Sequence, residues 1–139
     1  MKKLVSWAFG YAIAGMAGGV FYREFTKFNG FTDRTALSVV HTHLFFLGMI
    51  FMLVLLALSK LWPLRQHKMY KKFFIFYNIG VILTAVMLII RGCVQVLRIT
   101  LSAGADAALS GVAGIGHIIT AIGIIFFFIL LKRQLSEGE

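Results

Sequence analysis

The chain has 139 residues, of which 60% are hydrophobic and 14% are charged. A soluble domain of this length still exposes about a third of the surface of its unfolded chain, so this composition excludes an ordinary soluble domain. The net charge of +9 does not indicate a nucleic-acid partner, because the basic residues lie at the ends of apolar stretches and not on one basic and aromatic face. We therefore predict an integral membrane protein whose partner is the lipid bilayer.

Four apolar stretches each reach the roughly 20 residues that a helix needs to cross a bilayer. The predicted helices span approximately residues 4–22, 36–59, 73–99 and 107–131. The first stretch begins after two lysines, as a signal peptide does, but it ends in an aromatic and basic run at residues 21–23 that is typical of an interfacial anchor. We predict that this helix is retained.

Turn-forming residues lie between the predicted helices, at residues 27–33, at Trp62 and Pro63, and at residues 102–106. The sequence therefore predicts an all-α fold in which residues 1–139 form a single domain. This domain is expected to be an antiparallel bundle of four transmembrane helices.

Lysine and arginine are distributed unequally between the two ends of the predicted bundle. The nine on one side are Lys2, Lys3, Lys60, Arg65, Lys68, Lys71, Lys72, Lys132 and Arg133, and the five on the other are Arg23, Lys27, Arg34, Arg91 and Arg98. Basic residues concentrate on the cytoplasmic side of membrane proteins. We expect both termini to be cytoplasmic.

Small residues recur at intervals of four, which places them on one helical face and allows helix backbones to approach closely. They are Gly10, Ala14 and Gly18; Gly15 and Gly19; Ser110 and Gly114; and Gly116 and Thr120. This pattern predicts tight packing of the first and fourth helices. The partner is either another helix of this chain or a second copy, as in a homodimer.

Ionisable residues inside a membrane are energetically costly, so they indicate a functional site. With a rise of about 1.5 Å per residue, His41 and His43 are expected about 8 to 10 Å below the outer face, Arg91 about 12 Å and His117 about 15 Å. The sequence thus predicts one polar layer in the outer half of the bilayer. Residues that could cap this layer are Arg23, Glu24 and Gln95.

His41 and His43 are two positions apart, a rotation of about 200° on a regular helix. They therefore point to opposite faces and cannot both bind one centre. One is expected to face the bundle interior together with His117. The other is expected to face a second cofactor, another subunit or a backbone carbonyl.

Histidines on different helices of a bundle can hold haem, with neutral imidazole as the iron ligand. We predict haem b between the second and fourth helices, with His117 and either His41 or His43, His43 being preferred, as ligands of the haem iron. Arg91 would suit a haem propionate. The nearby residues that would leave room for a flat macrocycle are Gly48, Gly114 and Gly116.

Other interpretations of these residues remain open. Each histidine is also compatible with a hydrogen bond between helices or with proton handling. Arg91 is also compatible with snorkelling to the interface or with an ion pair to Glu24. The single cysteine, Cys93, lies in an apolar stretch and is interpreted as a small buried hydrophobe.

Three runs, at residues 20–28, 40–49 and 114–118, resemble a bacterial family of small four-helix membrane proteins known as domain of unknown function 2871. The resemblance covers nearly the whole chain. It implies four helices and a bacterial plasma membrane, and it implies no particular activity.

The His-x-His motif at residues 41–43, followed by an apolar run, is similar to a helix of haem-copper oxidase catalytic subunits, in which the two histidines serve two different haems. The resemblance implies a haem role for His41 and His43. Oxygen or nitric oxide reduction is not implied, because this chain has too few helices and lacks the further histidines that a copper site needs.

Three classes of function follow. The first is a haem-binding membrane protein for electron transfer, haem handling or gas sensing, with a redox partner. The second is a small transporter or channel for protons, metal ions or anions, and the third is a structural accessory subunit. We do not expect an enzyme, because the sequence has no nucleophile and base motif, no phosphate loop and no carboxylate pair within the membrane.

Overall fold

The computed structural model describes residues 1–136, and every regular element in this part of the chain is helical. The elements are α1 (Lys2–Phe28), η1 (Ala36–Val39), α2 (Val40–His43), η2 (Leu44–Ile50), α3 (Phe51–Leu61), η3 (Leu64–Gln66), α4 (Lys68–Val96) and α5 (Ala103–Ser136). The continuous run from η1 to α3, residues Ala36–Leu61, is here called the second span. Residues 137–139, the end of the predicted domain, lie outside the described residues.

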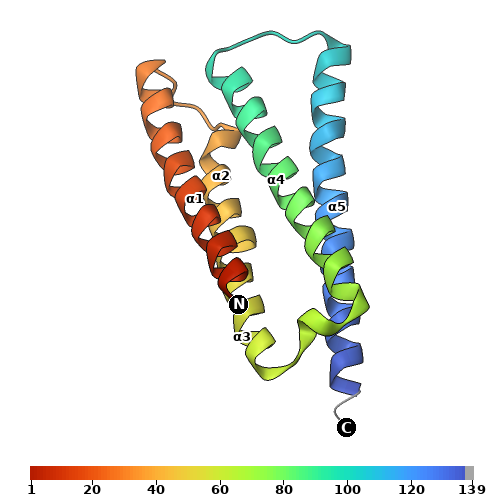
Figure 1. Ribbon diagram of the computed structural model, residues 1–139. Helices are drawn as coiled ribbons and strands as arrows, with labels where there is room; N and C mark the ends of the chain where they lie inside the picture. Colours follow the sequence, from red (N-terminus) through yellow and green to blue (C-terminus); the bar gives the residue numbers. More distant parts are fainter. Residues whose placement is uncertain (137–139) are drawn as a thin grey trace.

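Within residues 1–136, four helices are long and apolar enough to cross a membrane, namely α1, the second span, α4 and α5. Consecutive spans run in opposite directions, so that α5 ends at the end of the bundle where α1 begins (Figure 1). The predicted all-α fold is confirmed, with four helices among residues 1–136 that are long and apolar enough to span a membrane.

The helices extend beyond the apolar stretches that identified them, except that α4 ends at Val96, three residues before the predicted end. Helix α1 continues through Arg23, Glu24 and Lys27, and α4 begins at Lys68. Helix α5 begins at Ala103, where the hydroxyl of Ser102 accepts a hydrogen bond from the amide of Ala105. Hydropathy marks only the part of a helix that hydrocarbon can surround, whereas charged residues are good helix formers in the polar headgroup region.

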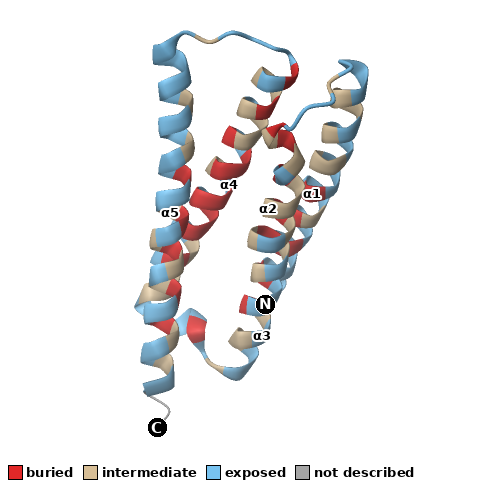
Figure 2. Cartoon of the chain, turned by 180° about the vertical axis from the view of Figure 1, so that it is seen from behind, coloured by how far each residue is buried: buried red, intermediate tan, exposed pale blue. Residues whose placement is uncertain are grey.

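The spans are arranged in the order α1, second span, α4, α5 (Figure 1). Among residues 1–136, α5 makes extensive backbone contacts only with α4 and the η3 turn. As a result, α5 is mostly exposed, whereas α4 carries a long buried face (Figure 2). The fold therefore leaves one side of α5 free of protein contact along most of its length.

Glycines allow α4 and α5 to cross closely. A Cβ atom added to Gly80 would lie 2.4 Å from the backbone nitrogen of Thr120, and one added to Gly123 would lie 2.7 Å from the backbone of Tyr77. At Gly116 the nearest atom would be the hydroxyl of Thr84, at 2.8 Å. These contacts fix the spacing of the two helices because backbone atoms cannot rotate away.

A second glycine seam joins α1 to the second span. Gly15 faces the ring of Phe45, Gly18 faces Val40, and Gly48 accepts the ring of Tyr11. In both seams, the helix that packs closely against the first or the fourth helix therefore belongs to the same chain. Gly10 and Gly114, in contrast, would have nothing within 4 Å of an added Cβ among the described residues.

The second span is not a regular helix. It begins with a 3₁₀ turn, whose first amide, at Ala36, donates to the side-chain oxygen of Gln95, and its residues Leu44–Ile50 form a π-helical segment. Such segments are often found at functional sites because they change which residues face a neighbour. Here the π-helical segment directly follows His41 and His43.

Candidate functional site

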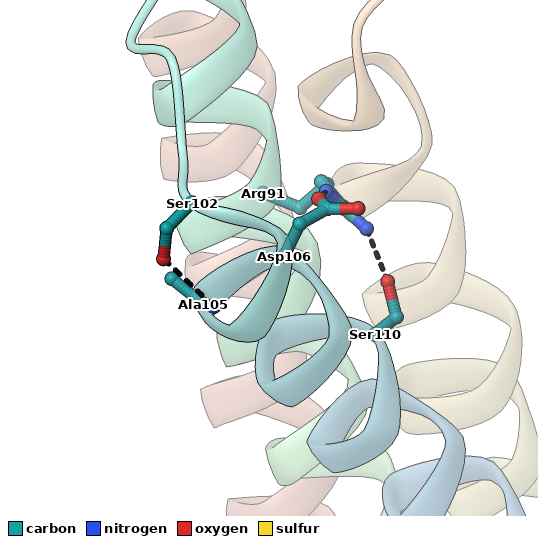
Figure 3. Close-up of polar contacts among 5 residues, drawn as sticks. All are labelled: Arg91, Ser102, Ala105, Asp106 and Ser110. Atoms are coloured by element: carbon teal, nitrogen blue, oxygen red, sulfur yellow. Dashed lines mark hydrogen bonds and ion pairs between the residues drawn. The ribbon is translucent and has the colours of Figure 1, made fainter.

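Arg91 lies near the end of the bundle where α4 ends and α5 begins. Its guanidinium contacts the carboxylate of Asp106 through Nη1 and the hydroxyl of Ser110 through Nη2, both in the first turns of α5 (Figure 3). The predicted alternative of an ion pair between Arg91 and Glu24 is wrong, because Glu24 instead lies 3.7 Å from Arg23.

The residues of the predicted polar layer do not all lie at one depth. Helix α5 begins earlier and α4 ends earlier than expected, which places His117 deeper and Arg91 shallower. His117 follows Gly116, which touches Thr84, and Arg91 is seven residues beyond Thr84 on α4. At about 1.5 Å per residue, Arg91 lies about 10 Å closer than His117 to the end of the bundle where α4 ends and α5 begins.

The three residues expected to cap the layer lie elsewhere. Arg23 and Glu24 are on the last turns of α1, where the side chain of Arg23 is 80% exposed. Gln95 caps the start of the second span through its bond to Ala36, at 2.7 Å. None of the three belongs to the level of His43 and His117.

His41 faces α1. Its Cβ lies 3.7 Å from the position of an added Cβ at Gly19, and its ring meets the edge of Phe45 at a centroid distance of 6.5 Å. Its Nδ1 atom is buried and has no hydrogen-bond partner among residues 1–136. His41 is thus packed at a helix contact on the side of the second span that faces away from α5.

His43 and His117 share one hydrogen-bond arrangement. Nδ1 of His43 lies 2.8 Å from the carbonyl oxygen of Val39, and Nδ1 of His117 lies 2.9 Å from that of Ala113. A carbonyl oxygen can only accept, so each Nδ1 must carry the proton. In the neutral imidazole this leaves the lone pair on Nε2, directed away from the helix that bears the histidine.

The direction of His117 follows from its neighbours on α5. Residues Gly116 and Phe127 face α4, whereas Phe126, about 100° to one side, packs against Phe76 at 5.5 Å on the edge of α4 that is remote from the second span. His117 is about 100° to the other side of Gly116. Its side chain is exposed and points to the side of α5 that faces the second span.

The direction of His43 follows in the same way. It is rotated by about 200° from His41, which faces α1. One turn later, the carbonyl of Leu47 accepts a hydrogen bond of 2.8 Å from the hydroxyl of Tyr77 on α4, and after two turns Phe51 packs against Phe127 of α5, with centroids 5.2 Å apart. His43 therefore lies on the face of the second span directed toward α4 and α5.

The depths of the two histidines can be compared through the contacts that their helices make along α4. Leu37 meets Gly92, and His43 is six residues further along the second span, about 10 Å. Thr84, which meets Gly116, is eight residues from Gly92, about 12 Å. His43 and His117 are thus at nearly the same level, one on each helix that flanks this face of α4.

Two glycines expected to leave space near the histidines do not do so. The side of Gly48 is filled by the ring of Tyr11, and that of Gly116 by Thr84. Only Gly114 is open. In the described part of the chain, moreover, no group of three or more His, Cys, Asp or Glu side chains could hold a metal ion.

Neither Asp106 nor Ser110 is among the predicted site residues, because residues 102–106 are predicted to be a loop and Ser110 is predicted to be a small residue of a helix-packing face. The signal was present, since Ser102 is a favourable N-cap residue and an acidic residue in the first turn suits the positive end of the helix dipole. A helix that begins directly after Ser102 places Asp106 in its first turn, at the same end of the bundle as Arg91. The structure brings the two residues into contact where α4 ends and α5 begins (Figure 3).

The contact between Arg91 and Asp106 is expected to stabilise the pairing of α4 and α5 only modestly. The Arg91 side chain is 29% exposed and that of Asp106 is 54% exposed, so water screens the pair. We expect Asp106→Asn and Arg91→Gln each to lower stability by about 0.5 to 1 kcal/mol, with little further loss in the double variant. Thermal unfolding in detergent of the four proteins checks this, and additive losses would show that the contact is not formed.

The fold and these polar groups define a class of small helical proteins, with four helices long and apolar enough to cross a membrane and with two histidines, His43 and His117, at nearly the same depth on the second span and α5. Within this class, the chain belongs to the family described as Protein of unknown function (DUF2871), whose family model matches residues 1–134. Comparison with curated proteins and with solved structures gives no match.

Proposed function

We propose that this protein binds one haem b between the second span and α5, with His43 and His117 as axial ligands, and that it transfers electrons in a bacterial plasma membrane with both termini in the cytoplasm. The observation that carries this proposal is the shared arrangement of the two imidazoles. Each donates Nδ1–H to a backbone carbonyl and leaves Nε2 free, which is the arrangement that metal-ligating histidines adopt.

The environment of the histidines supports the proposal. In a lipid solvent an imidazole that finds no partner for its polar edge is costly. The exposed His117 and the half-buried His43 both have a free Nε2 directed toward the region where the second span and α5 have no extensive backbone contact. A flat cofactor bound there would satisfy both nitrogens and cover the exposed side of α5.

Electron transfer is the favoured use because both axial positions would be taken by protein. A bound haem supplies a one-electron redox centre, and its axial ligands and surroundings decide between gas binding and electron transfer. With His43 and His117 both engaged, no position is open for a gas. The Nδ1–H bonds would hold both rings in the orientation and tautomer that ligation needs.

Arg91 has a supporting part in this proposal. A guanidinium carries five N–H donors, and contacts to Asp106 and Ser110 engage only its two terminal nitrogens. The remaining donors suit a propionate that reaches the outer end of the bundle. Arg91 would then orient the macrocycle, while the two histidines hold its iron.

The visible spectrum of the purified protein tests this function. The native chain and His117→Ala would be produced in haem-replete cells, purified in mild detergent and measured oxidised and reduced. We expect a Soret band that sharpens on reduction in the native protein and is absent from the variant. A native protein that stays colourless even after incubation with haem would contradict the proposal, and the histidines would then belong to transport or to helix packing.

A further inference from the structure

A cavity of about 440 Å³ lies at the end of the bundle opposite Arg91, where the turn between α3 and α4 meets the last turns of α5. Its lining includes Gln66, His67, Lys68, Met69 and Arg133. The turn is held in place because Leu64 is fully buried. The volume falls within the range of about 300 to 1,000 Å³ that is typical of small-molecule sites.

The cationic and N–H groups that line this cavity suit an anion. Lys68 and Arg133 are exposed cations, and neither forms an ion pair within residues 1–136, where the two salt bridges lie at the other end of the bundle. His67 accepts the amide hydrogen of Met69 on Nδ1, at 3.1 Å. Its proton must therefore be on Nε2, which makes His67 a third donor.

The start of α4 adds to this preference. Lys68 is its first residue and His67 its N-cap, so the positive end of the helix dipole points to the same cavity. Two cations, a histidine N–H donor and a helix start thus meet at one place. No carboxylate of the described chain lines the cavity.

The surface next to the cavity is apolar. Ile125 and Ile129 precede Arg133 at intervals of four residues and so share its face of α5, with 56% and 36% of their surface exposed. A shallow hollow lined by Ile129, Lys132, Arg133 and Ser136 joins the charged and apolar parts. The ligand that matches the whole surface has an anionic head and a hydrocarbon tail.

We propose that this cavity binds the phosphate group of an anionic phospholipid, with Lys68, Arg133 and His67 around the headgroup and an acyl chain along Ile129 and Ile125. Basic pockets between membrane helices are known to accept such headgroups. A free phosphate ion would use the charged half of the surface only. The site is at the opposite end of the bundle from Arg91 and does not depend on haem.

The experiment compares three forms of the full chain in detergent: the native protein, Lys68→Gln with Arg133→Gln, and Lys2→Gln with Lys3→Gln. The second double variant removes the same charge at the same end of the bundle, but away from the cavity. Binding of phosphatidylglycerol, of phosphatidylcholine and of inorganic phosphate would be measured by native mass spectrometry. Circular dichroism would verify that all three forms are folded.

We expect the native protein to prefer phosphatidylglycerol over phosphatidylcholine, and the Lys68 and Arg133 variant to bind phosphatidylglycerol roughly 10- to 30-fold more weakly. The Lys2 and Lys3 variant is expected to stay within about threefold of the native protein. Equal losses in both double variants would overturn the proposal, since the attraction would then be diffuse. Inorganic phosphate bound as tightly as the lipid, through the same residues, would overturn it in favour of a soluble anion.

The C-terminal residues provide one further check. Glu137 and Glu139 lie outside the described residues but follow Arg133 closely in the sequence. If Glu137→Gln with Glu139→Gln raised lipid binding tenfold or more, the result would show that the cavity binds the carboxylates of the chain's own terminus. The lipid proposal would then be wrong. We expect these two substitutions to change phosphatidylglycerol binding less than threefold.

Discussion

Replacing His43 by alanine is expected to abolish haem retention, whereas His41→Ala is expected to retain haem at the native ratio to protein. The two histidines are only two positions apart, but His43 faces the side of α4 and α5, with Nε2 free, while His41 is packed against Gly19 of α1. A single axial histidine holds haem far less firmly than two, so loss during purification in detergent should be nearly complete. The haem content per protein, measured by the pyridine haemochrome method, gives the result directly.

The matched control for this experiment is His67→Ala. His67 caps α4 at the other end of the bundle, so its loss should leave the haem content unchanged. The reverse pattern, in which His41→Ala loses haem and His43→Ala keeps it, would show that α1 and not α5 provides the second side of the site. Loss in all three variants would indicate general instability and would contradict the assignment of His43.

Gly80→Ala is expected to destabilise the protein strongly. An added Cβ would lie 2.4 Å from the backbone nitrogen of Thr120 and 2.7 Å from its Cα, so the two helices must move apart. Overpacking of this kind costs about 1 to 3 kcal/mol, and we expect the upper end because the clash is with backbone. The increased spacing would also displace His117, so that haem content should fall as well.

Gly114→Ala is the control for this prediction. Gly114 lies on the same pair of helices but has nothing within 4 Å of an added Cβ among the described residues. An alanine there should be neutral or stabilise the helix by up to about 1 kcal/mol, since glycine is the poorer helix former. Thermal unfolding in detergent measures both variants, and equal unfolding temperatures would show that α4 and α5 do not cross at Gly80.

The number of spanning helices could be predicted from the sequence because hydropathy reports directly on the solvent that a segment needs. The opposite directions of His41 and His43 could also be predicted, since rotation along a helix depends only on spacing. The choice between them could not, because it requires the neighbours of the second span. Only the contact between Gly19 and His41 shows which histidine is turned toward α1.

The errors have a common physical cause. Helix ends in the headgroup region carry polar residues, so hydropathy does not recognise them as part of the helix. For this reason Asp106, in the first turn of α5, is not predicted to be helical. The predicted alternative partner of Arg91, Glu24, is consequently on the wrong helix, since Arg91 contacts Asp106 of α5. The prediction that glycines leave space for a cofactor is wrong for Gly48 and Gly116, which provide space for Tyr11 and Thr84. Close helix packing is the commoner use of glycine in membranes.

The axial ligation of the bound haem tests the central claim most directly. Electron paramagnetic resonance of the oxidised native protein, compared with His43→Ala and His117→Ala reconstituted with haem, distinguishes two axial histidines from one. We expect a low-spin ferric signal in the native protein and high-spin or absent haem in each variant. A high-spin signal in the native protein, or a low-spin signal that survives either substitution, would contradict ligation by His43 and His117.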